Sequence, residues 1–93
     1  MLNQAVLVGR VSNIRTYNDN TWVTFNISCD DNKPIPISIE NSQMASSFVS
    51  LVTEGSLVGL KGVLEFIYQG SVQANALKFN VMKFSHLQET KGQ

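Results

Sequence analysis

Apolar and polar residues alternate along much of the chain, and this period of two is typical of β-strands that bury one face. The alternation is clearest over residues 23–29, where every second side chain is apolar, and it returns over residues 35–39. Pro36 lies inside the second segment, and a proline within a strand indicates an edge or a position whose amide has no partner. We expect both segments to be strands that cover one core, with Cys29 on the buried side of the first.

Three more strands are expected before and after these two. The chain opens with an apolar strand interrupted by Gly9 and Arg10, and a polar turn at residues 18–20 follows it. Residues 57–68 form the fourth strand, and a short hairpin returns the chain into the fifth, which runs toward Phe84. The side chains expected to point inward from the last two strands are Val58, Leu60, Leu64, Phe66, Leu77, Phe79 and Val81.

One helix is expected between the third and fourth strands. Asn41 or Ser42 caps its start, and apolar residues then recur at spacings of three and four, as on a helix with one buried face. These residues are Met44, Ala45, Phe48, Leu51 and Val52. Gly55 fits the left-handed position at the helix C-terminus. Three strands, a helix and two more strands is the element order of the five-stranded OB fold, in which this helix would plug one end of a barrel.

Four segments, in this order, resemble the bacterial single-stranded DNA-binding proteins. They are residues 1–11, with Gly-Arg after an apolar run, residues 23–29, residues 35–39, and residues 55–64, which begin with Gly-Ser. Together they extend over nearly the whole chain. The resemblance implies an all-β fold with one short helix, a five-stranded OB-fold Greek-key barrel whose first strand bends at its glycine, and a protein that binds single-stranded DNA.

Length and composition are consistent with one small domain. The chain has 93 residues, 43% of them hydrophobic, enough for one modest core that a second chain could supplement. We expect the OB-fold domain to cover residues 1–85, and residues 86–93, which carry almost nothing apolar, to be a flexible C-terminal tail. No apolar run reaches the roughly 20 residues of a membrane span, and no basic region precedes the opening apolar segment as in a signal peptide. A cytoplasmic protein without membrane contact is expected.

The sequence offers no group of residues suited to catalysis or metal binding. His86 is the single histidine, which excludes a site built from several histidines. Asp30 and Asp31 are adjacent carboxylates, but they lie in a polar turn with Asn32 and Lys33, where solvated side chains are expected. There is no phosphate-binding glycine loop, zinc spacing or nucleophile with a supporting base. We expect no enzymatic activity, no cofactor, no metal and no small-molecule substrate.

Binding of single strands without sequence preference depends on exposed aromatic rings, on which bases stack at ~1–3 kcal/mol per base, beside a basic groove. Trp22 is the main candidate, because it shares the polar side of its strand with Thr24 and Asn26, and this side faces the ligand in OB folds. A subunit interface is the other explanation for an outward Trp22. The remaining candidates for DNA contact are Tyr17, Tyr68 and Phe66, the last equally explained by core packing, and the basic residues Arg10, Arg15, Lys33, Lys61 and Lys78.

Charge and several substitutions set the chain apart from typical members of that family. Seven basic residues balance seven acidic ones, so the net charge is zero, and weak, salt-sensitive binding is expected. Pro34 and Glu40 stand where the family has outward stacking aromatics, and Glu40 would repel phosphate. The loops at residues 16–20 and 69–71 are short, and the chain ends without the family's acidic C-terminal tail. The resemblance is therefore to a short, divergent member.

Two functions are consistent with these observations. The first is non-sequence-specific binding of single-stranded DNA, by base stacking and phosphate contacts, in DNA replication, recombination and repair. The second is an OB-fold assembly factor of the primosomal, replication-restart type, in which protein contacts dominate and DNA binding is weak. Self-association is expected as well, because the opening strand is apolar on both faces and would invite aggregation if left uncovered. We expect the first function and a homo-tetramer of two dimers, with a dimer as the alternative.

Overall fold

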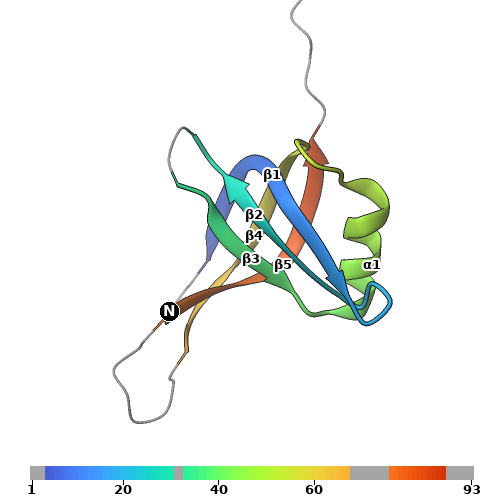
Figure 1. Cartoon of the computed structure of the whole chain (residues 1–93). Coiled ribbons are helices and arrows are strands. Elements are labelled where there is room, and N and C mark those ends of the chain that lie inside the picture. The colour runs from blue at the N-terminus through green and yellow to red at the C-terminus, as the bar shows by residue number, and fades with distance from the viewer. Residues whose placement is uncertain (1–3, 31–32, 68–75, 88–93) are drawn as a thin grey trace, which may run out of the picture.

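Five strands close into a barrel, and a single helix packs against β2, β3 and β5 (Figure 1). The computed structural model describes residues 4–30, 33–67 and 76–87, and only the backbone of residues 66–67 and 76–78. The elements are β1 (Ala5–Tyr17), β2 (Trp22–Ser28), β3 (Ile35–Ile39), α1 (Ser42–Leu51), β4 (Leu57–Ile67) and β5 (Ala76–Leu87). The strand order around the barrel is β1-β2-β3-β5-β4. The prediction of an all-β OB-fold with one short helix is confirmed.

β1 serves both halves of the barrel. Its residues 5–10 pair antiparallel with β4, and its residues 10–17 pair antiparallel with β2. Gly9 lies next to this change of partner, where an added Cβ would overlap the carbonyl oxygen of Ser28. β3 and β5 then close the barrel as a parallel pair, joined at Ser38 and Asn80. A glycine in the opening strand, which has no Cβ, therefore allows the backbones of β1 and β2 to approach closely.

The helix contributes its apolar face to the centre of the core. Phe48 is fully buried, and its ring stacks on Phe25 of β2 at a centroid distance of 4.4 Å and meets the edge of Phe84 at 5.2 Å. Full burial of such a side chain stabilises the fold by ~1.5–3 kcal/mol. Asn41 caps the helix, because its side-chain oxygen accepts a hydrogen bond of 2.9 Å from the amide of Met44. Tertiary packing thus holds a helix whose serine-rich sequence is a weak helix former.

The C-terminal end of the helix differs from the prediction. The helix ends at Leu51, whose side chain is 57% exposed, so its assignment to the buried stripe is wrong. Val52 is buried, as its apolar character predicted, but its backbone is extended rather than helical. Gly55 does have a positive φ of 87°, but it belongs to a turn in which the amide of Ser56 donates to the carbonyl of Thr53. The extended backbone at Val52 ends the helix before the glycine is reached.

Inward positions of the last two strands follow the prediction only within the barrel. Val58 and Leu60 of β4 are buried with Phe79 and Val81 of β5, but Leu64 is 40% exposed. The described pairing of β4 with β1 ends at Gly62, and Leu64 lies beyond it on the β4–β5 hairpin. Figure 1 shows this hairpin projecting from the barrel. The side chains expected inward at positions 66 and 77 lie outside the described residues.

Cys29 is exposed, so its predicted burial is wrong. β2 ends at Ser28, and the alternation of the strand therefore no longer decides where the next side chain points. Ile35, at the start of β3, is also 37% exposed, because it lies at the same end of the β2–β3 hairpin. Both residues belong to the rim of the barrel.

The predicted turn after β1 is confirmed. Asn18, Asp19 and Asn20 all have positive φ, which these residue types tolerate better than most, and Thr21 donates its amide to the carbonyl of Tyr17. At the other end of the chain, β5 continues to Leu87, two residues past the expected domain limit. Residues 88–93 lie outside the described residues, and the flexible tail stays a prediction.

Two glycines provide a test of these close backbone approaches. An added Cβ at Gly9 would overlap a carbonyl oxygen of β2, and one at Gly62 would overlap the carbonyl oxygen of Asn80, whereas at Gly59 it would make ordinary contacts of 3.8–3.9 Å. We expect Gly9→Ala and Gly62→Ala each to lower the free energy of unfolding by ~1–3 kcal/mol in urea denaturation. Gly59→Ala, the matched control, should change it by less than about 0.5 kcal/mol. Equal stability of all three variants would contradict the described approach.

Candidate nucleic-acid interface

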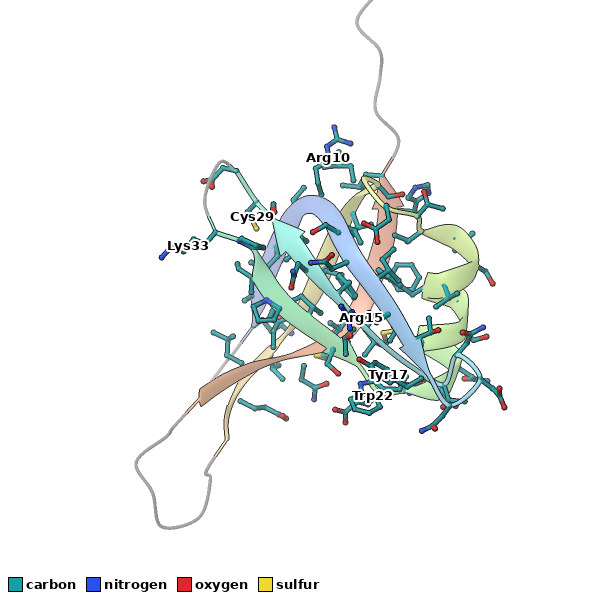
Figure 2. All side chains as sticks on the ribbon, viewed as in Figure 1. Arg10, Arg15, Tyr17, Trp22, Cys29 and Lys33 are labelled. Carbon is teal, nitrogen blue, oxygen red and sulfur yellow. The ribbon has the colours of Figure 1, made fainter. Side chains whose placement is uncertain are left out.

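Two aromatic rings lie side by side where β1 ends and β2 begins. Tyr17 and Trp22 are cross-strand partners, and their ring centroids are 4.6 Å apart with a tilt of 33° (Figure 2). Both side chains are just over one-third exposed. The indole Nε1 of Trp22 donates a hydrogen bond of 2.7 Å to the Oγ of Ser38 on β3. The indole is therefore held in place from two sides before any ligand arrives.

A groove runs over β2 and β3 beside this aromatic pair. Buried core side chains and less buried polar residues line it together. The lining residues are Asn13, Arg15, Thr24, Phe25, Asn26, Pro36, Ile37, Ser38, Glu40 and Phe79. Thr24 and Asn26, which the alternation of β2 predicted to share the outer side with Trp22, are half-buried here. Ser38 and Glu40 connect the groove to the aromatic pair, since Ser38 bonds to Trp22 and Glu40 lines a second hollow with it.

An irregularity in β1 decides which side chain enters this groove from the first strand. The pairing register with β2 shifts between Ser12 and Arg15, and Asn13 has a positive φ of 56°. The exposed amides of Asn13 and Ile14 donate hydrogen bonds of 3.0 and 2.8 Å to the two carboxylate oxygens of Glu54. Adjacent backbone amides in such a bulge form a concave anion site, and Glu54 occupies it.

The bulge reverses the facing of the strand. Arg15 has the odd position number of Gly9 and Val11, both of which point into the barrel, so a regular strand would aim Arg15 at the core. After the bulge Arg15 instead pairs with Thr24 and lines the groove. Glu54, on the segment between α1 and β4, thus stabilises the bulge that places Arg15 in the groove.

The other basic candidates lie elsewhere. Arg10 is at the opposite end of the barrel from the aromatic pair, where its guanidinium donates to the carbonyl of Gly55 at 3.1 Å, and Lys33 lies at the far end of the β2–β3 hairpin (Figure 2). Lys61 of β4 faces outward next to Val6 of β1, away from the groove. Among the basic candidates whose side chains are described, Arg15 alone lines the groove.

Three candidates are not placed by the structure. The side chains of Phe66 and Lys78 are outside its described part, although their backbones pair within the β4–β5 hairpin. Tyr68 lies wholly outside the described residues. Of the eleven residues expected at the DNA site, the aromatic pair and groove therefore unite Trp22, Tyr17, Thr24, Asn26 and Arg15.

Sequence reasoning missed several of the groove residues, among them Ser38 and Asn13. The alternation of β3 places Ser38 on the outward side, so its position could be predicted from the sequence pattern. Its hydrogen bond to the indole of Trp22 could not. Asn13 reaches the groove only because the bulge exists. The sole hint was the tolerance of asparagine for positive φ, which is too common a property to indicate a bulge by itself.

A second surface, away from the groove, carries both cationic and exposed apolar side chains. On the outer side of β1, β4 and β5, Val6 pairs with Lys61 and Lys61 with Lys83, while Val8 pairs with Gly59 in the next row. Val6 is 66% and Val8 47% exposed. We call this surface the β1–β4–β5 face. The described residues that line its shallow hollow include no acidic side chain.

Within the described ranges, no group of three or more His, Cys, Asp or Glu side chains is arranged to hold a metal ion. The single helix found there is too short to cross a membrane.

Comparisons with known proteins identify the fold. No protein-family model and no curated sequence matches the chain. Among solved structures, the mitochondrial single-stranded DNA-binding protein Rim1 of S. cerevisiae superimposes with a TM-score of 0.74 at 14% identity, over 96% of this chain and 98% of its own.

Two further structures are similar. The Plasmodium falciparum SSB, in a complex with ssDNA, has a TM-score of 0.64 at 17% identity, over 95% of this chain and 96% of its own. A small single-stranded DNA-binding protein from Streptomyces coelicolor gives 0.61 at 16% identity, over 92% and 94%. At such identities the likeness establishes the OB-fold architecture along nearly the whole chain.

The carboxylate that holds the β1 bulge gives a prediction for this site. Glu54→Gln replaces one acceptor oxygen with an NH2 group that cannot accept from a backbone amide, so one amide of the bulge loses its partner. We expect the free energy of unfolding to fall by ~1–3 kcal/mol, measured by urea denaturation. Asp19→Asn, which removes the same charge from an exposed turn at positive φ, is the control and should be close to neutral. A neutral Glu54→Gln would show that the bulge does not depend on this carboxylate.

Proposed function

We propose that the protein binds single-stranded DNA without recognising a defined sequence, as part of DNA replication, recombination and repair. The observation that carries this proposal is the fixed, exposed Tyr17–Trp22 pair at the mouth of a groove on β2 and β3. Stacking on aromatic rings is the interaction by which single strands are held irrespective of base identity. The names of similar structures agree, because the Rim1 and Plasmodium proteins are single-stranded DNA-binding proteins.

In the proposed complex one base stacks on Trp22 and its neighbours follow the groove over β2 and β3. Thr24 and Asn26 supply hydroxyl and amide groups to base edges or sugars, and Arg15 contacts a phosphate. With one described cation in the groove, each protomer neutralises few phosphates. Base stacking therefore supplies most of the affinity, and binding is weak enough that the loss of a few phosphate contacts in added salt makes it fade, as the zero net charge predicts.

A titration with oligo-dT tests this function through Trp22, the only tryptophan in the chain. Its emission should be quenched as the strand stacks on the indole, and Trp22→Ala should lose ~1–3 kcal/mol of binding free energy with folding and oligomeric state unchanged. The alternative, an assembly factor whose protein contacts dominate, predicts the opposite pair of results. DNA would then leave the emission unchanged, and the alanine variant would dissociate into smaller species.

A matched pair of charge variants locates the phosphate contact. Arg15→Gln should weaken binding of oligo-dT and reduce the slope of log affinity against log salt by about 0.7, the value for one phosphate on a single strand. Lys61→Gln removes the same charge from the β1–β4–β5 face and should leave both quantities unchanged. A larger effect of Lys61→Gln would place the strand on the other side of the barrel.

We also propose that the protein is a homo-oligomer. Residues 5–9 of β1 have a strand partner on the β4 side, and the pairing with β2 begins only at Arg10, so the described barrel leaves one edge of this segment uncovered. Pairing of two such edges forms a dimer. Two dimers then pack through Val6 and Val8 into a tetramer, against the repulsion of Lys61 and Lys83.

Salt should shift this assembly in a defined direction. Because salt screens like charges, the tetramer should gain population over the dimer as the salt concentration rises at tens of micromolar protein. Multi-angle light scattering measures both species. A monomer under these conditions would exclude the proposed edge pairing, and a tetramer that dissociates as salt is added would exclude packing through the lysine-bearing face.

A further inference from the structure

The hollow beside Trp22 contains a carboxylate. Glu40 follows directly after β3, and its side chain lines both the groove and the hollow formed with Asn18, Thr21, Trp22 and Ser42. It is exposed. Among the described residues that line these two depressions, Glu40 is the only acidic one. It therefore shares with Trp22 the hollow that a base stacked on the indole would adjoin.

A carboxylate at this position acts against phosphate. Its repulsion keeps the sugar-phosphate backbone away from Glu40, while Arg15 attracts the backbone from another part of the groove. A nucleotide stacked on the indole is thus oriented with its base edge toward Glu40. The indole itself is held by Ser38 and covered on one side by Tyr17, which restricts the direction in which the base can lie.

The chemistry of a carboxylate selects among base edges. An ionised carboxylate only accepts hydrogen bonds, and its two oxygens offer about four acceptor positions, so bonds within the protein leave capacity for a ligand. Guanine presents N1–H and the N2 amino group side by side, and these can donate two parallel bonds to the two oxygens. Cytosine and adenine present one amino group each on this edge. Thymine presents a single N–H between two carbonyl oxygens, which a carboxylate repels.

We propose that the Trp22–Glu40 subsite prefers guanine, so that a protein which binds single strands generally holds guanine-containing strands more tightly than thymine strands. This inference rests on the proposed DNA-binding function and deepens it. We expect a preference of about tenfold, which lies in the lower part of the discrimination that a bidentate pair with a base provides.

Three strands of equal length test the proposal with the full chain. One contains only thymine, the second has guanine at every third position, so that runs of guanine are absent, and the third has hypoxanthine in place of guanine. Hypoxanthine keeps N1–H and lacks the N2 amino group. Quenching of Trp22 should give about tenfold tighter binding for the guanine strand than for thymine, with hypoxanthine between them.

Glu40→Gln should reduce this preference to near unity, because its amide nitrogen cannot accept the second bond. It should also strengthen binding of the thymine strand slightly, since the repulsion is removed. Glu65→Gln is the matched control, because Glu65 accepts a hydrogen bond from Asn80 away from the hollow and its loss should leave the preference intact.

The outcomes separate the two proposals. If all three strands quench Trp22 with equal affinity, the protein binds single strands and the guanine preference is wrong. A preference that survives in Glu40→Gln would also overturn the assignment to this carboxylate. If none of the strands binds, the proposed function fails, and the subsite with it.

Discussion

β1 is the strand on which the rest of the molecule depends, because it pairs with β4 over its first half and with β2 over its second. A strand that belongs to two halves of a barrel has to bend and to change its facing. Gly9 permits the bend by letting two backbones approach, and the bulge at Asn13 changes the facing. A side chain at position 9 would weaken the closure of the barrel, and without the bulge the groove would lose Arg15. The closure of the barrel and the composition of the groove therefore both depend on β1.

The distribution of charge follows from this geometry. Arg15 reaches the groove, while Lys61 and Lys83 lie on the β1–β4–β5 face and Arg10 lies at the other end of the barrel. A neutral chain can bind a polyanion when its charges separate onto different surfaces, but here the described cations are spread over several parts of the surface. The groove has consequently to rely on stacking and on polar contacts to bases, and it is in such a groove that a carboxylate can discriminate between bases.

Sequence patterns were sufficient where a side chain lies in a regularly paired part of a strand or in the middle of the helix. The alternation of β2 placed Val23, Phe25 and Ile27 in the core and Trp22 outside, and the asparagine-rich turn was recognisable from its residue types. Patterns failed at ends and irregularities. Cys29 lies one residue past β2, and Leu64 lies two residues past the last described pairing of β4 with β1, so the alternation of these strands does not decide whether either side chain is buried.

The candidate site shows the same limit. The period of two in β2 predicted the outward positions of Trp22, Thr24 and Asn26. Arg15 reaches the same groove only because of a bulge in β1, and this bulge is held by Glu54, a residue about 40 positions away in the chain. The separation of Arg10 and Lys61 from the groove likewise depends on which strands are neighbours. Such contacts between distant segments have no periodicity from which a single sequence could reveal them.

The lysine pair on the β1–β4–β5 face has a thermodynamic consequence. Lys61 and Lys83 are direct cross-strand neighbours, an arrangement of like charges that costs free energy in the isolated chain and more when a second copy approaches the same face. Any anion that lies between them removes this cost. In the proposed tetramer, anion binding and assembly are then coupled, and reciprocity requires that whatever anion promotes assembly is itself bound more tightly by the assembled form.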